Sequence, residues 1–271
     1  GEKVGLTLIE CEANQLTLPR MQLSDFNLAK VRALLESRSG MLLVVGQSRS
    51  GKSTVLRALV RELNNEHRNI YTLERAVGQQ MEGVNQIELN PRAGLIESSA
   101  LRSILSGDPD VIMIERLFGT DTGRLAFEAA VARHLVLAGC YQQDAAAGVR
   151  HTNDLHLEPH LVAHGLRGVW AQTLLPRLCD DCKQPQMAPA NIKGLEEGER
   201  VYRRLGCSAC NDSGYRGLIA VQEVLASSDE LREAILRRAP AAEFRELVEV
   251  PMRTDGLDKL RAGRQVMRLE C

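Results

Sequence analysis

Short apolar runs alternate with amphipathic stretches through the first half of the chain. Continuous apolar runs at residues 41–45, 111–114 and 135–137 predict buried strands, because a strand covered on both faces has no polar side. Residues 69–74 predict a further short strand. Stretches with helical periodicity fall between these runs, at residues 55–60, 98–105 and 122–133. This alternation predicts an α/β protein with a mainly parallel sheet and helices on both faces.

The pattern changes in the second half of the chain. After about residue 158 it predicts helices and a cysteine-bearing insertion, and from Ser228 onward it predicts short amphipathic helices. At the other end, the chain begins with Gly1 in place of Met and enters a strand-like stretch at residues 4–9. We therefore expect that a region upstream of Gly1 is missing from this sequence.

A glycine-rich motif follows the first predicted strand. Residues 46–53 have the pattern G-x-x-x-x-G-K-S and lie between a strand and a helix, which is the context of a phosphate-binding P-loop. The glycines let backbone N–H groups point inward, and the N-terminus of the following helix favours an anion. Lys52 would neutralise the β- and γ-phosphates of ATP, and the Ser53 hydroxyl would ligate Mg²⁺. The candidate nucleotide-binding residues are Gly46, Ser48, Ser50, Gly51, Lys52, Ser53 and Thr54.

The alternative, a glycine-rich turn that binds nothing, is disfavoured by the complete motif in this context.

The amino-acid composition narrows the classes of function that the protein could have. The chain has 271 residues with 44% apolar content, which supplies a sizeable core, and its 34 basic and 35 acidic residues nearly cancel. Aromatic residues make up only 3%, which disfavours a stacking platform for single-stranded nucleic acid. No apolar run approaches the ~20 residues of a membrane span, and no signal peptide is evident, so we expect a cytoplasmic protein.

Two cysteine pairs form a second motif. Cys179 and Cys182 make one C-x₂-C pair, and Cys207 and Cys210 make another, separated by 24 residues. Four thiolates in this arrangement suit tetrahedral Zn²⁺ that staples a loop without taking part in catalysis. Redox pairs or ordinary buried cysteines are the alternative, but duplicated pairs in a cytoplasmic protein favour the metal. The other cysteines, Cys11, Cys140 and Cys271, are assigned no function.

Further segments carry a family resemblance. Residues 108–113 resemble the approach to the Walker B strand of the secretion ATPases that drive type II secretion and type IV pilus assembly. Residues 207–217 are similar to that family's second cysteine knuckle and the glycine turn after it. Other matches lie at residues 84–86, 128–130, 134–137, 168–172, 252–253 and 255–256. They cover almost the whole chain, and the two cysteine pairs combined with a P-loop are specific to this family.

The resemblance implies a RecA-like P-loop core that binds ATP between the subunits of a hexameric ring and transmits its hydrolysis to an inner-membrane platform protein. Residues 1–35 would be the tail of an N-terminal module and a linker. Residues 36–225 would form the ATPase core, with a zinc-binding insertion at about 176–217, and residues 226–271 a C-terminal helical region. The expected partners are copies of this chain, or a paralogue in a mixed ring, and the platform and cytoplasmic-ring proteins. The protein would lie in the cytoplasm against the inner membrane and would bind no nucleic acid.

The chain departs from the family pattern at the Walker B position. The family's strand ends in Gly-Glu, and that Glu polarises the attacking water, whereas this chain has Glu115 and Arg116. An arginine cannot accept a proton from water. Glu115 could help hold Mg²⁺ or act as a displaced base. Arg116 has a purely structural alternative, as a salt-bridged residue at the end of a strand.

Two further motifs are altered. The family's acidic box has Glu followed by Asp, and this chain keeps Glu74 as a candidate catalytic acid but has Arg75 beside it. The family's histidine box is replaced by residues 141–144, so that Tyr141 stands where an imidazole would sense the γ-phosphate. Tyr141 can donate a hydrogen bond but carries no positive charge at neutral pH.

A copy of the histidine-box letters occurs at residues 151–154, ten residues later. Ungapped spacing places His151 on a helix outside the active site, so we interpret this match as a coincidence. His156, His160 and His164 follow at helical spacing. A metal or nucleotide site is one hypothesis for this helix face, and solvated or interfacial histidines are the favoured alternative.

Two hypotheses follow for function. In the first, the chain is a divergent secretion or pilus-assembly ATPase that binds ATP and hydrolyses it weakly. In the second, it is a pseudo-ATPase that serves as a structural or regulatory ring subunit. Arg75 and Arg116 add positive charge to the candidate site where the family has acidic residues. This charge favours anion binding and weakens metal-assisted hydrolysis. A nucleic-acid-dependent enzyme of the same fold is disfavoured by the neutral charge, the few aromatics and the cysteine insertion.

Overall fold

A seven-stranded sheet forms the centre of the protein in a computed structural model that describes residues 17–188, 194–249 and 251–263. Its strands are β1 (Gly40–Val45), β2 (Ile70–Glu74), β3 (Val84–Glu88), β4 (Val111–Ile114), β5 (Leu135–Cys140), β6 (Leu166–Leu178) and β9 (Tyr215–Ala226). They lie in the order β3-β2-β4-β5-β1-β6-β9. All neighbours pair in parallel except β6 and β9, which are antiparallel. The predicted mainly parallel sheet is therefore confirmed, while the strand predicted at residues 4–9 lies outside the described residues.

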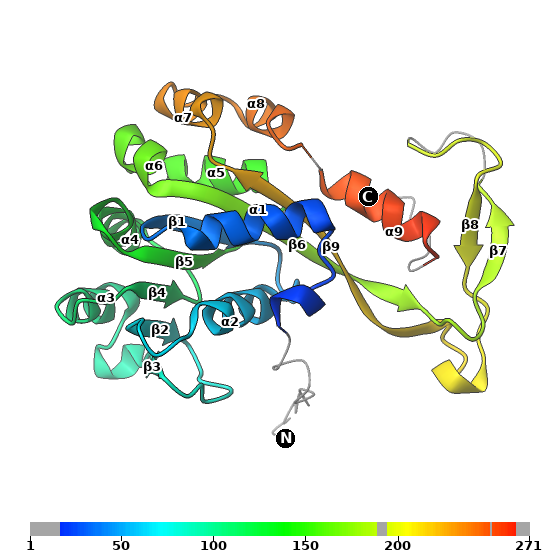
Figure 1. The fold of residues 1–271 in the computed structure, drawn as a ribbon, viewed down its shortest axis with the longest axis horizontal. Helices are drawn as coiled ribbons and strands as arrows, with labels where there is room; N and C mark the ends of the chain where they lie inside the picture. The colour runs from blue at the N-terminus through cyan, green and yellow to red at the C-terminus, as the bar shows by residue number, and fades with distance from the viewer. Residues whose placement is uncertain (1–16, 189–193, 250, 264–271) are drawn as a thin grey trace, which may run out of the picture.

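Helices cover both faces of the sheet, as predicted (Figure 1). On β1, Met41, Leu43 and Val45 face one layer, whereas Leu42 and Val44 face the other, because successive side chains of a strand alternate. The second layer contains α1 (Asp25–Glu36) and α2 (Lys52–Leu63). The first contains α3 (Glu97–Leu105), α4 (Thr120–Ala132), α5 (Ala145–Asp154), α6 (Pro159–Gly165), α7 (Asp229–Leu236) and α8 (Ala241–Glu246). Both faces of β1 are buried, which explains its continuous apolar run.

Several of these helices begin at side-chain caps. The Asp144 carboxylate accepts a hydrogen bond from the Ala147 backbone at the start of α5, at 2.6 Å. Ser228 caps α7 in the same way through the Leu231 N–H, at 3.2 Å. Such caps satisfy backbone donors that a helix leaves unpaired at its N-terminus. They fix where α5 starts after β5, which places residues 141–144 at the edge of the sheet.

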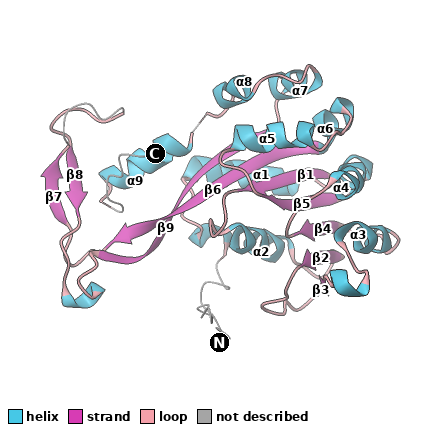
Figure 2. Ribbon diagram, turned by 180° about the vertical axis from the view of Figure 1, so that it is seen from behind, coloured by secondary structure: helices cyan, strands magenta, loops and turns pink. Residues whose placement is uncertain are grey.

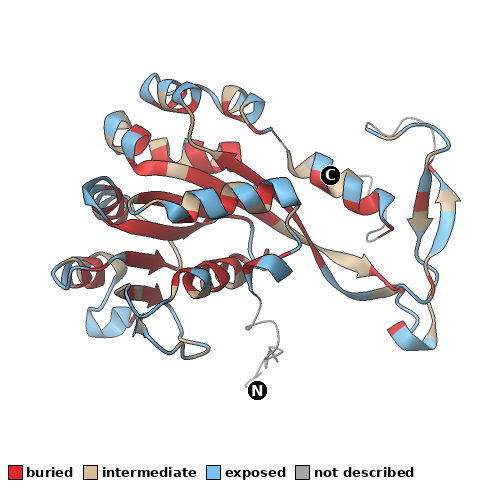
Figure 3. Ribbon diagram, viewed as in Figure 1, coloured by how far each residue is buried: buried red, intermediate tan, exposed pale blue. Residues whose placement is uncertain are grey.

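The prediction of helices after residue 158 is wrong for two long segments, because β6 and β9 are strands. β6 and β9 both continue beyond the sheet as a two-stranded arm, which reaches the separate hairpin of β7 (Gln184–Met187) and β8 (Arg200–Arg203) (Figures 1 and 2). Burial along β6 falls from its first half to its second (Figure 3). The strand therefore has neither one continuous apolar run nor one simple alternation, which are the two patterns that predict strands.

The C-terminal region forms short helices, as predicted. α7 and α8 pack on the first helix layer, whereas α9 (Met252–Arg261) lies along β9 and reaches β8. Figure 1 shows α9 between the body of the protein and the β7–β8 hairpin. This helix therefore connects the arm to the central sheet.

Phe127 on α4 provides a test of the first helix layer. Its ring is fully buried and packs against Gly165 at the end of α6. We expect Phe127→Ala to lower the free energy of unfolding by about 3–5 kcal/mol, because it leaves a cavity in a layer that cannot fully close. Urea denaturation followed by circular dichroism measures this change.

Phe118→Ala is the matched control, because the Phe118 side chain is 65% exposed. We expect it to change the free energy of unfolding by less than about 1 kcal/mol. Equal losses in the two variants would contradict the packing described here.

Candidate nucleotide-binding site

The P-loop connects β1 to α2 as the motif predicted. Gly51 precedes the first residue of α2 and has a φ of 83°, in the left-handed region that favours glycine. A Cβ at Gly51 would lie 2.7 Å from the Gln172 side-chain nitrogen, and a Cβ at Gly46 would lie 2.5 Å from the Gln172 carbonyl oxygen. The two glycines are therefore required by the close approach of β6 as well as by the turn.

Lys52 is held in place by the loop that it follows. Its ammonium group donates to the carbonyl oxygens of Gly46 at 2.8 Å and Gln47 at 2.7 Å. It also lies 4.0 Å from the centre of the Tyr141 ring. Burial lowers the pKa of Lys52 from its ordinary value. The lysine is thus fixed at the base of the cavity, where a phosphate would give its charge a stronger partner than the ring does.

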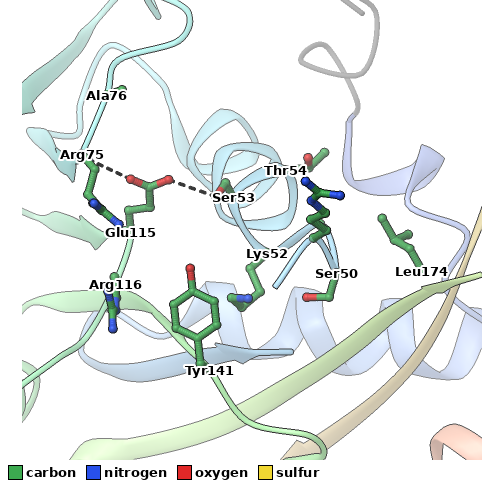
Figure 4. A pocket seen from close by; sticks show the side chains of 12 residues that line it. Ser50, Lys52, Ser53, Thr54, Arg75, Ala76, Glu115, Arg116, Tyr141 and Leu174 are labelled. Atoms are coloured by element: carbon green, nitrogen blue, oxygen red, sulfur yellow. Dashed lines mark hydrogen bonds between the residues drawn. The ribbon is translucent and has the colours of Figure 1, made fainter. Parts of the chain in front are cut away.

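A cavity of about 640 Å³ opens above the P-loop (Figure 4). This volume lies in the range of small-molecule sites. Its lining is Arg49, Ser50, Gly51, Lys52, Ser53, Thr54, Arg75, Ala76, Glu115, Arg116, Tyr141 and Leu174. Four of these residues are cationic at neutral pH and one is acidic. The cavity is therefore suited to a polyanion such as a nucleoside triphosphate.

Five of the seven predicted nucleotide-binding residues line this cavity, and Gly46 and Ser48 do not. Gly46 is buried at the base of the loop, and Ser48 is exposed at its tip. Sequence reasoning did not single out Arg49 or Leu174 as lining residues. Arg49 lies inside the motif and could have been included, whereas Leu174 comes from β6 and reaches the site only through the sheet.

Glu115 faces the P-loop from the end of β4. One of its carboxylate oxygens accepts a hydrogen bond from the Ser53 hydroxyl at 3.1 Å, and the other accepts from the Arg75 backbone N–H at 2.8 Å (Figure 4). Carboxylate and hydroxyl oxygens are ligands that suit Mg²⁺. Ser53 and Glu115 together therefore fit the requirements of a magnesium site beside the phosphates.

Glu74 takes a different position from Glu115. Its side chain is fully buried and pairs with Arg57 of α2 at 3.0 Å. It also accepts hydrogen bonds from Thr72 at 2.8 Å and from Gln86 at 3.0 Å. Glu74 does not line the cavity. This carboxylate joins β2, β3 and α2, and no exposed face of it is directed at the candidate nucleotide.

Arg116 and Tyr141 line the cavity side by side, with the Tyr141 ring between Arg116 and Lys52 (Figure 4). The guanidinium carbon of Arg116 is 5.1 Å from the centre of the Tyr141 ring and 4.8 Å from that of Phe118. Within the described residues Arg116 forms no ion pair, so the salt bridge of the structural alternative is absent from this part of the chain. Its charge faces the cavity unneutralised by a carboxylate.

The four predicted zinc ligands meet at the end of the arm. Their sulfur atoms all lie within 4.8 Å of one another. The Cys207–Cys210 sulfurs are 3.7 Å apart, and the Cys179–Cys207 and Cys182–Cys210 sulfurs are 3.9 Å apart. Four thiolates about 2.3 Å from a tetrahedral Zn²⁺ would be separated by about 3.8 Å. Backbone N–H groups of Gly206 and Gly214 also point at these sulfurs, so the donor set fits a closed structural site.

The comparison with known protein families agrees with this geometry. The model of the family described as type II/IV secretion system protein matches residues 1–269. The chain belongs to this family. It is 34% identical to the type II secretion system ATPase E of Vibrio cholerae over 281 residues, which cover 99% of the chain and 56% of that protein. It is 31% identical to the type IV pilus assembly ATPase PilB of Thermus thermophilus, over 97% of the chain and 31% of that protein.

Solved structures show the same fold at lower identity. The pilus retraction motor PilT with bound ADP superposes with a TM-score of 0.71 at 21% identity, over 93% of this chain and 65% of that one. The ATPase DotB of Legionella pneumophila gives a TM-score of 0.67 at 20% identity, over 94% of this chain and 64% of that one. The chain spans 56% or less of the lengths of the two curated relatives described above, so it corresponds to one part of such secretion-family proteins.

The histidines of this secretion-family chain do not form the expected helix face. His160 and His164 lie on α6, but His156 lies before that helix with a φ of 54°. The expectation that all three share one face is wrong, because a left-handed residue separates α5 from α6. His151 lies on α5 as predicted, and burial lowers its pKa. In the described part of the chain, the four cysteines are the one group of three or more His, Cys, Asp or Glu side chains that lie close enough to share a metal, and none of these histidines belongs to it.

The cysteine cluster makes a testable prediction. We expect the purified protein to contain about one zinc ion per chain by elemental analysis. Cys179→Ser should remove most of this zinc and lower the melting temperature, because the thiolates would no longer close the end of the arm. Cys271→Ser, which changes a cysteine outside the predicted ligand set, should retain zinc. Full zinc content in Cys179→Ser would contradict the assignment.

Proposed function

We propose that this chain is the motor-type domain of a type II secretion or type IV pilus assembly ATPase that binds ATP through its P-loop with weak or lost hydrolysis. The observation that supports this most directly is the composition of the cavity. Its P-loop side retains Lys52 and Ser53, whereas Arg75, Arg116 and Tyr141 line it at the three positions where the chain departs from the family pattern. The first group serves phosphate binding, and the second group supplies no base to activate water.

In this proposal the P-loop supplies most of the binding energy. The backbone N–H groups at the start of α2 would hold the phosphates, and Lys52 would exchange its contact with Tyr141 for a phosphate oxygen. Ser53, with Glu115 behind it, would hold Mg²⁺. When bound, this ion would neutralise negative charge on the phosphates. Arg49, Arg75 and Arg116 would add further positive charge around them.

Weak hydrolysis follows from the lack of an available base. Glu115 would be the displaced base of the sequence hypothesis, but hydrogen bonds from Ser53 and the Arg75 backbone hold its carboxylate at the position proposed for Mg²⁺, where positive charge would weaken it as a base. Glu74 is fully buried against Arg57. Arg116 occupies the position from which the family's glutamate polarises water and carries the opposite charge. Attack by water would therefore lack the general-base contribution of about 10²–10⁴-fold.

The alternative function is that of a pseudo-ATPase, a structural or regulatory ring subunit that uses nucleotide, or none, as a folding ligand. The stacking of Arg116 and Lys52 on Tyr141 favours this possibility, because it stabilises the site without a nucleotide. In either form we propose that the chain works in a ring, with copies of itself or with a paralogue. The ring would contact inner-membrane platform and cytoplasmic-ring proteins from the cytoplasm. No helix in the described residues is long and apolar enough to span a membrane.

Nucleotide binding is tested by thermal denaturation. We expect MgATP at a hundred times its Kd to stabilise the protein by about 2.7 kcal/mol, because the ligand binds only the folded state. Lys52→Ala should abolish this stabilisation. Arg92→Ala, at an exposed position outside the cavity, should retain it. An equal stabilisation of Lys52→Ala would contradict binding at the P-loop.

Hydrolysis is tested by steady-state phosphate release. We expect little turnover in the wild-type protein and a rise of about tenfold or more in Arg116→Glu, because a carboxylate at this position can accept a proton from water. Arg92→Glu controls for the change in net charge. Turnover only in Arg116→Glu would favour the pseudo-ATPase, slow wild-type turnover that Lys52→Ala abolishes would favour the divergent ATPase, and rapid wild-type turnover would exclude both.

A further inference from the structure

A series of buried polar side chains leads from the P-loop to the C-terminal helix. Gln172 of β6 and Gln222 of β9 lie opposite each other in the antiparallel pair of strands. Both side chains are almost fully buried, as are those of Asp255 and Lys259 on α9. Burying a polar group costs free energy unless it is hydrogen-bonded, so the hydrogen-bond partners of these four side chains indicate their role.

The first contact in this series fixes the P-loop backbone. The side-chain nitrogen of Gln172 donates to the Ser50 carbonyl oxygen at 2.8 Å. In a trans peptide the carbonyl and the following N–H point in opposite directions. By holding the Ser50 carbonyl, Gln172 therefore turns the Gly51 N–H away from β6. Gly51 lines the cavity, so this contact sets the direction of a donor at the candidate phosphate site.

The second contact fixes Gln172 itself. The side-chain nitrogen of Gln222 donates to the Gln172 side-chain oxygen at 2.7 Å and to the Met21 carbonyl at 3.0 Å. Because the series begins and ends at backbone carbonyls, which only accept hydrogen bonds, the amide nitrogens must face Met21 and Ser50. The orientation of both glutamines is therefore determined, and neither amide can turn over without losing its acceptor.

The third set of contacts joins Gln222 to α9. The Gln222 backbone N–H donates to the Asp255 carboxylate at 2.8 Å, and Lys259 donates to that carboxylate and to the Ala220 carbonyl, both at 2.6 Å. The Asp255–Lys259 pair thus satisfies the outward-facing backbone groups of β9 at the edge of the sheet. An edge covered in this way is protected from other pairing.

The same helix is joined to the arm and to α5. Lys183, next to the ligand Cys182, donates to the Gly263 carbonyl after α9 at 3.1 Å. The Glu223 carboxylate accepts the Ala145 N–H at 2.7 Å and the Met252 N–H at 2.8 Å, which connects the starts of α5 and α9. Displacing α9 would therefore disturb contacts at the arm, at β9 and beside the cavity together.

We propose that Gln172 and Gln222 are positioning residues of the nucleotide site, through which the P-loop conformation and the docking of α9 are energetically coupled. The coupling to nucleotide rests on the proposed function. The connection between the P-loop and α9 does not rest on the proposed function, because it consists of hydrogen bonds within the protein that need no nucleotide. Coupling is reciprocal, so a nucleotide that orders the P-loop would also stabilise the docking of α9.

The test uses Gln222→Met in the full chain. This variant removes the two side-chain hydrogen bonds but keeps the backbone N–H that Asp255 accepts. In the protein without nucleotide, we expect hydrogen exchange over residues 46–52 to become faster. Exchange at residues 145–149 should stay unchanged, because the Glu223 contacts are intact. Thr152→Val is the matched control, since it removes a buried hydrogen bond, from its hydroxyl to the Val149 carbonyl, outside this series. Unchanged exchange over 46–52 in Gln222→Met would overturn the proposal.

The second measurement uses a fluorescent ATP analogue. We expect its Kd to rise about fivefold or more in Gln222→Met and to stay unchanged in Thr152→Val. Binding should slow exchange over residues 252–262 in the wild-type protein and do so less in the variant. An unchanged Kd in Gln222→Met, or equal slowing in both proteins, would overturn the coupling.

The experiments distinguish a failure of the proposed nucleotide binding from a failure of the proposed role of Gln172 and Gln222. If the wild-type protein binds no analogue, the proposed function fails, and the exchange measured without nucleotide still decides whether Gln222 positions the P-loop. If Gln222→Met does not fold, Gln222→Asn serves instead, because it keeps the amide but is too short to reach both acceptors. Faster exchange over 46–52 in Gln222→Asn would support the proposal, and wild-type exchange would overturn it.

Discussion

Parallel pairing of β1 with β5 and β6, buried between two helix layers, is the constraint on which the site depends. In this register Val45 lies beside Cys140 on one side and Ala171 on the other. The residues that follow these three, Gly46, Tyr141 and Gln172, must therefore emerge next to one another. Pairing of β4 with β5 adds Glu115 at the same edge of the sheet. Ligands of open α/β sheets bind at this carboxyl edge, and the cavity lies there.

The electrostatics of the cavity follow from which residues occupy these strand ends. A carboxylate beside the P-loop serine and arginines farther out form a site in which charge attracts phosphates but no free base faces them. Tyr141 stabilises the cations through its ring, which compensates for part of their mutual repulsion. Binding and hydrolysis make different demands on a site, and in the proposed function this arrangement meets the first better than the second.

The arm formed by β6 and β9 carries the cysteine cluster at its end, away from the cavity. Four cysteine sulfurs converge at its end, and α9 lies between the body of the protein and the β7–β8 hairpin (Figure 1). Because β6 and β9 run from the sheet into the arm, with one irregularity in their pairing between Pro176 and Leu178, the cysteine cluster and Gln172 are carried by the same pair of strands. Rigid strands of this kind transmit a displacement along their length better than a loop would.

Elements with a local cause could be predicted from the amino-acid sequence. The buried strands show as apolar runs, the P-loop as its glycine and lysine spacing, and the cysteine cluster as two C-x₂-C pairs, because each depends on residues close together in the chain. The departures at Arg75, Arg116 and Tyr141 were also evident from single positions. Which side chains face the cavity could not be predicted in this way, because it depends on contacts between distant residues. The tertiary structure buried Glu74 against Arg57, engaged both oxygens of Glu115 and brought Leu174 to the site.

The long strands β6 and β9 and the series from Ser50 to Lys259 were likewise decided by tertiary structure. A strand that leaves the core midway has no single hydrophobic period, so its pattern does not predict it. The role of a buried glutamine depends on its hydrogen-bond partner, and the partners Gln172 and Gln222 are 50 positions apart in the chain. Local patterns determine elements, whereas contacts between distant residues arise only when the sheet sets their register.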